Sequence, residues 1–253
     1  MSALHIALSR HDTLTIAVSG GVDSMTLAHV AHGVLGQRAR MVHATSPAVP
    51  PLATRRVQDH AARAGWRLDL VDAGEFDDPR YRANPLNRCY FCKTNLYGTI
   101  AALTEGAIAS GTNTDDLGDF RPGLKAAQEW RVLHPYVEAA MDKAAVYALA
   151  TRLGLADLAA LPAQPCLASR VETGIMVTAE DLTFVDTVEQ ALRDTLGQGA
   201  TVRCRITGAG VIVETEGAPP PDRIAALCCD TGRTYLGHRP YRRGAAFLQG
   251  PLA

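Results

Sequence analysis

The sequence has no stretch that would cross a membrane or direct the chain through one. None of its apolar runs reaches the ~18 residues of a membrane-spanning helix. The opening residues, MSALHIALSRHDTL, contain His, Arg and Asp where a signal peptide needs an unbroken apolar segment. We therefore expect a cytoplasmic protein with no membrane partner. In that reducing compartment its six cysteines should be thiols, ligands or redox groups, not structural disulfides.

An excess of charge of one sign is also missing. The 253 residues carry a formal net charge of -1, with no basic tract and no appended RNA-binding module, which argues against a nucleic-acid partner. Disorder is excluded by composition, because 47% of the residues are hydrophobic and only 20% are charged. The length fits one large domain, or a large domain followed by a small one.

The first part of the chain alternates between strand and helix patterns. Strand patterns occupy residues 14–19, 40–46, 66–73, 107–112 and 131–136. The helical patterns between and after them cover residues 24–35, 52–65, 91–104 and 141–153. Such alternation predicts an α/β fold with a doubly wound parallel sheet, whose ligands lie beyond the carboxyl ends of the strands.

The pattern changes near Gly174. A helix is predicted from Thr178, with Thr178 as its N-cap, and strands at 201–206 and 211–216 precede a helix at 219–227. We therefore expect an α/β domain over residues 1–175 and a small α+β domain over residues 176–253.

The hexapeptide SGGVDS lies between the first predicted strand and the first helix. Gly20 and Gly21 let the backbone approach a phosphate group, and the helix N-terminus offers free N–H donors. Ser19 and Ser24 add hydroxyl groups, and Asp23 can help to hold Mg²⁺. The Walker sequence GxxxxGK[ST] is absent. The pattern favours ATP chemistry, and the alternative is an ordinary glycine turn.

A second candidate segment for nucleotide binding, GTNTDDLGDFRPG (111–123), follows the fourth predicted strand. Its three carboxylates suit Mg²⁺–pyrophosphate, and its arginine suits a carboxylate or a phosphate. The alternative is a solvated acidic loop with Asx turns. Together with Ser46, beyond the second strand, the candidates here are Gly111, Asp115, Asp116, Asp119 and Arg121.

Two cysteines at metal-ligand spacing, Cys89 and Cys92 in RCYFCK, have no second pair to complete a zinc site. Cys166 lies in the proline-rich turn AQPCLASR, which we expect along the same edge of the sheet. Three thiolates with one open position suit a [4Fe–4S] cluster or a catalytic zinc. Three unrelated thiols, or a redox CxxC, are the alternatives. The remaining cysteines are expected to be buried as small hydrophobic side chains: Cys204, Cys228 and Cys229.

Five segments resemble, in order, the LarE family of ATP-dependent sulfurtransferases: SGGVDS, DDPRYRANPLNRCYFCK (77–93), GTNTDDLGDFRPG, YVEAAMDKAAV (136–146) and PAQPCLASR. The likeness covers most of residues 13–175. It implies the PP-loop ATP pyrophosphatase fold, also called adenine nucleotide alpha hydrolase-like. It further implies adenylation of a carboxylate of pyridinium-3,5-biscarboxylic acid mononucleotide, release of pyrophosphate and conversion to a thiocarboxylate, in the maturation of the nickel-pincer cofactor of lactate racemase.

The resemblance also assigns roles to single residues. Family members with the additional CxxC hold a [4Fe–4S] cluster that passes on sulfide, which makes Cys89, Cys92 and Cys166 ligands. Other members sacrifice the cysteine that matches Cys166. By this resemblance the catalytic residues are Cys166, Asp23, Ser19 and Ser24. ATP and Mg²⁺ would be bound by the residues given above for SGGVDS and for the aspartate loop, together with Ser46. The acceptor nucleotide would be held by Arg121, Ser169, Arg170, Arg203, Arg205 and Glu214.

Two other functions stay open at this point. PP-loop proteins with a CxxC and a third cysteine also thiolate tRNA, although the net charge speaks against it here. An ATP-regulated iron–sulfur carrier without catalysis is the second, and it leaves the aspartate loop idle. In each case we expect a homo-oligomer, and the sequence does not identify the source of sulfide.

Overall fold

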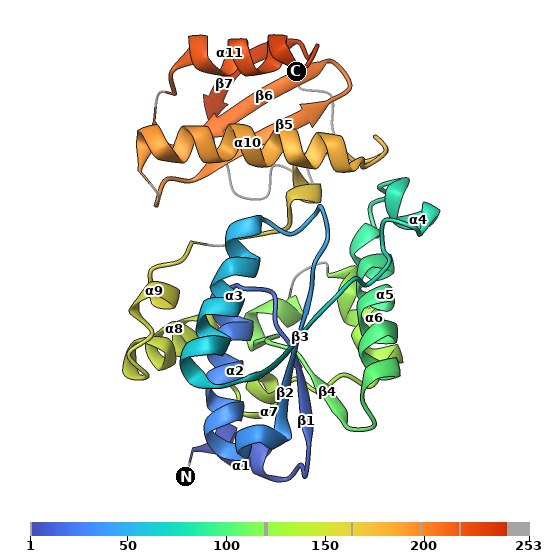
Figure 1. The fold of residues 1–253 in the computed structure, drawn as a ribbon, viewed down its shortest axis with the longest axis vertical. Coiled ribbons are helices and arrows are strands. Elements are labelled where there is room, and N and C mark those ends of the chain that lie inside the picture. The colour runs from blue at the N-terminus through green and yellow to red at the C-terminus, as the bar shows by residue number, and fades with distance from the viewer. Residues whose placement is uncertain (1, 119–120, 163, 198, 218, 242–253) are drawn as a thin grey trace. The chain divides into compact units, whose positions relative to one another are not determined.

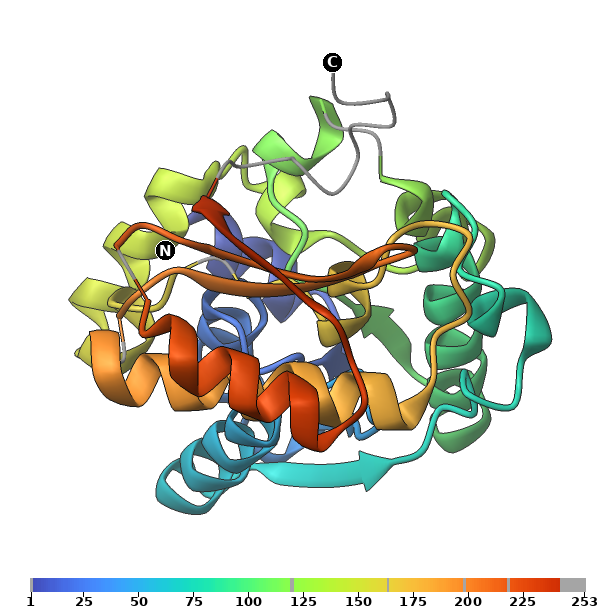
Figure 2. The same cartoon turned by 90° about the horizontal axis from the view of Figure 1, so that it is seen from above.

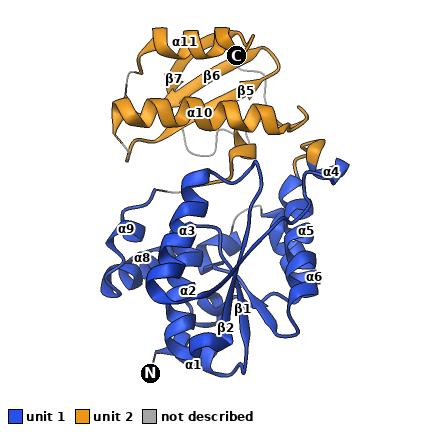
Figure 3. Cartoon of the chain, viewed as in Figure 1, with its two compact units in different colours: residues 1–81, 87–164 blue, residues 82–86, 165–253 orange. Residues whose placement is uncertain are grey.

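The computed structural model describes residues 2–118, 121–162, 164–197, 199–217 and 219–241 (Figure 1). The chain separates into two compact units (Figure 3). Unit 1 comprises Met1–Tyr81 and Asn87–Gln164, and unit 2 comprises Arg82–Leu86 and Pro165–Ala253. The domain boundary expected at residue 175 lies inside unit 2. Unit 2 is therefore built from two segments of the chain, a short one and a long C-terminal one.

Unit 1 is built on a four-stranded sheet in the order β3-β2-β1-β4. Its strands are β1 (Leu14–Ala17), β2 (Ala39–Ala44), β3 (Arg67–Val71) and β4 (Ala107–Ala109). All pairings are parallel, and Ile16 of β1 lies between Met41 and Ala109. The predicted α/β fold with a parallel sheet is therefore confirmed.

Helices cover both faces of this sheet. On one face α1 (Ala3–Ser9), α2 (Val22–Leu35), α3 (Pro51–Ala64) and α8 (Lys143–Arg152) pack against Ile16 and Met41. On the other, α5 (Arg88–Leu103) and α6 (Pro122–Glu129) pack against Val42 and Ile108 (Figure 1). Strands buried on both faces explain the short, nearly continuous apolar runs in the sequence. The short elements of unit 1 are α4 (Pro79–Arg82), α7 (Pro135–Glu138), α9 (Ala156–Ala159), η1 (Gly36–Arg38) and η2 (Thr114–Gly118).

The strand predicted at residues 131–136 is wrong. This segment makes one isolated parallel bridge, from Leu133 to Ala109, and then turns into α7. Arg131 adopts a positive φ of 52°, and Pro135 has no N–H to donate to a ladder. A strand cannot extend past either residue, although the apolar pattern of RVLHPY suggests one.

Unit 2 contains a three-stranded sheet with two helices on one of its faces (Figure 2). Strand β5 (Val202–Thr207) is antiparallel to β6 (Gly210–Thr215), and β7 (Tyr235–Pro240) is parallel to β6. The helices are α10 (Ala179–Leu196), which Thr178 caps as predicted, and α11 (Pro221–Asp230); η3 (Leu167–Arg170) precedes them. The sequence pattern misses β7, because its residues alternate only between half-buried and exposed. Cys204 and Cys228 are buried as expected, but Cys229 is exposed, because the next residue of a helix faces another direction.

The short segment Arg82–Leu86 is tied into unit 2 by hydrogen bonds. Asn84, with 0% of its surface exposed, donates from Nδ2 to the carbonyls of Val171 (3.3 Å) and Glu172 (2.8 Å). The backbone N–H of Val177 donates to the Arg82 carbonyl at 2.8 Å. Among the helices of the described residues, none combines the length and hydropathy that a membrane crossing requires.

Candidate active site

Two glycines shape the turn between β1 and α2. Gly20 has φ +81°, and a Cβ there would lie 2.8 Å from the Ala53 carbonyl oxygen of α3. A Cβ on Gly111, in the loop after β4, would lie 2.7 Å from the Ser24 nitrogen. Distances under 3.0 Å do not occur for real Cβ atoms. Both positions therefore require glycine, because backbone from a neighbouring element passes directly over them.

The turn leaves a run of backbone donors without acceptors. The N–H groups of residues 20–24 have no hydrogen-bond acceptor within the part of the chain that the structure describes. Gly21, the N-cap of α2, supplies no side-chain cap. The Ser24 hydroxyl accepts from the Ser19 N–H at 3.0 Å and lies 3.1 Å from the Ser19 hydroxyl. Unpaired donors at the start of a 14-residue helix suit a phosphate group.

Asp23 has partners that the sequence analysis did not identify. The Lys143 ammonium donates to its Oδ2, and the Asn113 amide donates to its Oδ1 at 3.2 Å. The Tyr136 hydroxyl donates to the Asp23 carbonyl at 3.0 Å, and burial raises the pKa of Tyr136 well above its usual value, so the phenol stays protonated. Lys143 is one of only three lysines in the chain, which was the available signal.

The acidic loop after β4 is folded around its own carboxylates. Asp115 accepts from the Lys143 N–H at 3.2 Å, and Asp116 accepts from the Asn113 N–H at 3.1 Å. Arg121 forms an ion pair with Asp116 at 2.7 Å. Asp119 lies outside the described residues. Asp115 therefore lies at the N-terminal end of α8, where Lys143 begins the helix. Asp116 is connected to the start of α2 through Asn113, which also bonds Asp23. Ser46, after β2, accepts from the Ala48 N–H at 3.2 Å and is half-buried.

A half-buried arginine of α3 contacts the glycine turn. Arg56 donates from Nη1 to the Gly20 carbonyl at 2.7 Å and to Oε1 of Gln164 at 3.2 Å. Burial lowers the pKa of Arg56 from its usual value. Nothing local in the sequence marks this residue, because it lies 36 positions from Gly20.

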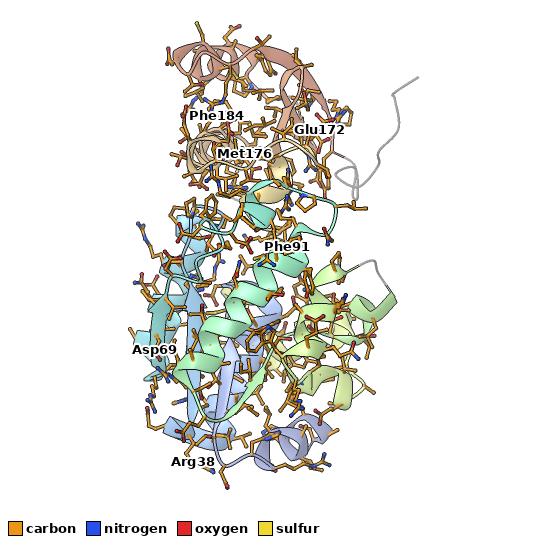
Figure 4. All side chains as sticks on the ribbon, turned by 90° about the vertical axis from the view of Figure 1, so that its right-hand side faces the viewer. Arg38, Asp69, Phe91, Glu172, Met176 and Phe184 are labelled. Atoms are coloured by element: carbon orange, nitrogen blue, oxygen red, sulfur yellow. The ribbon has the colours of Figure 1, made fainter. Side chains whose placement is uncertain are left out.

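The CxxC cysteines lie on the first turn of α5 in unit 1. Cys89 is exposed and Cys92 is half-buried, and a separation of three residues places them on the same helix face. Phe91, which follows Tyr90 on this turn (Figure 4), stacks beneath the Arg80 guanidinium at 5.0 Å. Two thiols at a helix N-terminus are favourably placed to ionise and to bind a metal. Their spacing suits two ligands of one metal site.

Cys166 belongs to unit 2 and caps η3. Its carbonyl accepts from the Ser169 N–H at 3.0 Å, the Ser169 hydroxyl at 2.8 Å and Nη1 of Arg170 at 3.1 Å. Within the described residues, no three His, Cys, Asp or Glu side chains are grouped to hold a metal ion.

Arg170 is used inside the fold. It is 3% exposed and forms a two-pronged ion pair with Glu189 of α10, at 2.8 and 3.0 Å. Its Nη1 donates to the carbonyls of Pro165 and Cys166. Arg170, predicted to bind the acceptor nucleotide, holds the turn that carries Cys166. Glu189 was missed, because an acidic residue within a helix gives no sign of burial.

Two arginines bind one buried glutamate on the sheet of unit 2, and a third arginine lies opposite it in the strand register. Glu214 accepts from Arg205 at 2.9 Å and from Arg239 at 2.7 and 2.9 Å. Arg203 pairs with Glu214 in the strand register, and burial lowers the pKa of Arg203 to about 10. Arg205 also donates to the Ser169 carbonyl at 2.9 Å. The cluster carries more positive than negative charge, which suits an anionic ligand. Arg239 was missed with the strand that carries it.

Comparison with known proteins identifies the relatives of this chain. No protein-family model matches it. An uncharacterized protein of Synechocystis sp. is 42% identical over 186 residues, which cover 72% of this chain and 69% of that protein. An uncharacterized protein of Methanocaldococcus jannaschii is 24% identical over 198 residues (77% and 75% of the two chains). The pyridinium-3,5-bisthiocarboxylic acid mononucleotide synthase of Lactiplantibacillus plantarum is 29% identical over 197 residues (76% and 71%).

The synthase is a distant relative, and its likeness extends over three quarters of the chain. The Synechocystis protein is a nearer one. The chain therefore belongs to the family of the Synechocystis protein, and its distant likeness to the synthase supports the LarE family, to which its motifs point.

Proposed function

We propose that the protein is an ATP-dependent sulfurtransferase that converts a carboxylate of pyridinium-3,5-biscarboxylic acid mononucleotide to a thiocarboxylate. The observation that carries this proposal is the run of unpaired N–H donors at residues 20–24, next to Asp23 and Lys143. The Lactiplantibacillus relative is named for the bisthiocarboxylic acid mononucleotide, which is the product class expected here.

The first step is adenylation. The glycine turn receives the phosphates of ATP, and a carboxylate oxygen of the acceptor attacks the α-phosphorus, so that pyrophosphate leaves with the electron pair of the broken P–O bond. Asp23, Asp115 and Asp116 are oxygen ligands of the kind Mg²⁺ prefers. The Lys143 ammonium can release Asp23 to Mg²⁺ and neutralise phosphate charge instead.

The second step transfers sulfur. Sulfide adds to the carbonyl carbon of the acyl adenylate, and AMP leaves with the electron pair of the C–O bond. Cys89, Cys92 and Cys166 are the residues that would hold a [4Fe–4S] cluster. Such a cluster, with three protein ligands, supplies an iron with an open position for sulfide. Arg170 and Ser169 hold the backbone of Cys166 in position.

Binding of the acceptor falls to the arginine cluster of unit 2. Arg203 and Arg205 carry planar guanidinium groups that match phosphate and carboxylate in two-pronged contacts, which lysine cannot reproduce. Arg239 extends this cluster along β7, and Glu214 keeps Arg205 and Arg239 in fixed orientations. Arg121 supports the aspartate loop through Asp116 and is the candidate from unit 1.

The test is a complete reaction under anaerobic conditions. The purified protein, with Mg²⁺–ATP, the biscarboxylic mononucleotide and sulfide, should yield AMP, pyrophosphate and a thiocarboxylate that mass spectrometry detects. Absence of acceptor-dependent pyrophosphate release would refute the proposal. Thiolation of added tRNA in place of the mononucleotide would refute the choice of acceptor.

The sulfur source needs its own measurement. The anaerobic protein should be brown and hold roughly four irons per chain, as a [4Fe–4S] site implies, and Cys89→Ala, Cys92→Ala or Cys166→Ala should each lose them. Cys229→Ala is the matched control, since this exposed cysteine lies outside the proposed ligand set. Stoichiometric dehydroalanine at residue 166 after turnover, with Cys89 and Cys92 dispensable, would instead establish Cys166 as a sacrificial donor.

A further inference from the structure

We propose that Arg56 positions the glycine turn for ATP: it fixes the Gly20–Gly21 peptide so that the Gly21 N–H faces the nucleotide phosphates, and it supplies positive charge to them. This inference rests on the proposed ATP chemistry and adds to it a residue from α3, outside SGGVDS and outside the aspartate loop.

The orientation of the peptide follows from one hydrogen bond. Arg56 Nη1 donates to the Gly20 carbonyl at 2.7 Å, which holds this oxygen on the α3 side of the turn. In a trans peptide the carbonyl and the following N–H point in opposite directions, and the described chain has no cis peptide. The Gly21 N–H therefore points away from α3. It has no acceptor within the described residues.

A second contact from α3 keeps the turn in the same place. Gly20 lies so close to Ala53 that an added Cβ would meet the Ala53 carbonyl at 2.8 Å. Ala53 and Arg56 are three residues apart, so they lie on one face of α3. This face therefore holds Gly20 in two ways: Ala53 contacts it sterically, and Arg56, one turn later, donates a charged hydrogen bond to its carbonyl. The shape of the turn depends on α3 as well as on its own glycines.

Arg56 forms no ion pair among the described residues, and Asp157, the carboxylate whose charge reaches it, is itself bonded to His60. No carboxylate of the described residues lies within 4.0 Å of its guanidinium, and its two contacts, the Gly20 carbonyl and Gln164, are neutral. Its Nε and Nη2 groups have no partner among the same residues. A half-buried cation with no carboxylate in contact is stabilised when an anion binds near it. The other cation at the site, Lys143, is already paired with Asp23.

A triphosphate satisfies both requirements. Its oxygens accept from the Gly21 N–H that Arg56 holds in position, and its negative charge attracts the Arg56 guanidinium across the Gly20–Gly21 peptide. Adenosine has no phosphates and gains nothing from either effect. The inference therefore predicts that Arg56 discriminates between ATP and adenosine, which a residue with a purely structural role would not do.

The experiment measures binding of Mg²⁺–ATP and of adenosine to four forms of the whole chain by calorimetry: wild type, Arg56→Met, Arg56→Lys and Arg55→Met. Loss of a charge-assisted hydrogen bond and a cation should weaken ATP binding roughly 10- to 100-fold in Arg56→Met. Arg56→Lys keeps the charge but not the fork geometry, so it should lose less. Arg55, the exposed neighbour on α3, is the matched control and should change ATP affinity less than about twofold. Adenosine affinity should stay the same in all four.

The outcomes separate this inference from the proposed function. Wild-type affinity for ATP in Arg56→Met would overturn the role of Arg56 and leave the proposed function standing. Equal loss of ATP and adenosine affinity would also overturn it, by showing a general structural defect. If Arg56→Met does not fold, Arg56→Lys decides in the same way. A wild-type protein that does not bind Mg²⁺–ATP would overturn both.

Discussion

Two arginines, one in each unit, show how differently the chain treats a buried cation. Arg170 in unit 2 is 3% exposed and fully engaged by Glu189 and by backbone carbonyls. Burial lowers its pKa, but the charge of Glu189 outweighs this, so the pKa of Arg170 is raised overall. Arg56 in unit 1 is half-buried, and burial lowers its pKa by more than the charge of Asp157 raises it. Arg170 is neutralised within the fold, whereas Arg56 is not.

The difference distinguishes residues that build the protein from those prepared for a ligand. A cation that is paired with its counter-ion inside the fold contributes to the structure, so removing it should lower the stability of the protein. Removing a cation that lies beside unpaired N–H donors should instead lower the affinity for an anionic ligand. The same division separates Glu189, which is buried in unit 2, from Asp23, which is half-buried at the glycine turn. Four variants or conditions test this comparison.

The largest expected effect is on stability, from Glu189→Ala. The change leaves the Arg170 guanidinium buried without its counter-ion and the Cys204 N–H without its acceptor at 3.1 Å. Breaking a buried ion pair on one side costs about 3–5 kcal/mol of unfolding free energy, which urea denaturation measures. Glu180→Ala, on the exposed side of α10, should cost less than about 0.5 kcal/mol. A loss under about 1 kcal/mol for Glu189→Ala would contradict the structural role.

The next effect concerns activity, from Asp23→Ala. Removing this carboxylate takes away the partner of Lys143 and a candidate ligand of Mg²⁺. Loss of one charge-stabilising group of an active site typically costs ~10²-fold or more in rate. Acceptor-dependent pyrophosphate release measures it, with Asp59→Ala, an exposed position on α3, as control. Release at near wild-type rate from Asp23→Ala would refute its role.

Gly111→Ala should have an intermediate effect on both properties. The added methyl group would meet the Ser24 nitrogen at 2.7 Å and push the loop after β4 away from the glycine turn. Overpacking of this kind costs about 1–3 kcal/mol. The midpoint temperature of thermal unfolding and the affinity for ATP should both fall. Gly118→Ala, where an added Cβ has nothing within 4 Å, is the control, and equal behaviour of the two variants would show that the close approach is unimportant.

The smallest effect is a pH dependence in unit 1. Burial first, and then the charge of His60, lower the pKa of His29 to about 4 from 6.5. The unfolded chain therefore binds the proton more readily, and stability falls as pH drops from about 6.5 towards 4. Allowing for solvent screening, we expect a loss of about 1 kcal/mol between pH 7 and pH 5, measured by urea denaturation. His29→Gln should flatten this dependence and the exposed His5→Gln should not; equal slopes would contradict the assignment.

The parts of the site that depend on local backbone geometry could be predicted from the sequence. A short apolar strand, two glycines and a helix start are enough to define the turn at Ser19–Ser24 and its free donors. The parallel sheet is confirmed for the same reason, because each strand and helix carries its own pattern. The failure at residues 131–136 arises where one residue, Pro135, outweighs that pattern.

The parts that depend on distant side chains could not be predicted. Asp23 meets Asn113 and Lys143 across 90 and 120 residues of sequence, and apart from the rarity of lysine no local pattern marks that contact. The ion pair of Arg170 is another long-range contact of this kind, because its partner Glu189 lies 19 residues later in the chain. The pairing of Arg170 with Glu189 depends on how α10 packs against η3 and β5, which the sequence pattern does not indicate.

The segment Arg82–Leu86 belongs to unit 2 but is synthesised well before the rest of it, which affects folding during biosynthesis. Asn84 leaves the ribosome 87 residues before Val171, the first of its two backbone partners. At ordinary rates of translation this delay is roughly 4–17 seconds. During that time the rest of unit 1, from α5 to Gln164, is made, while Asn84 waits in water for its partners. Unit 2 can therefore close only after the sheet of unit 1 has been synthesised, and a chain cut short after Gln164 would leave this segment undocked.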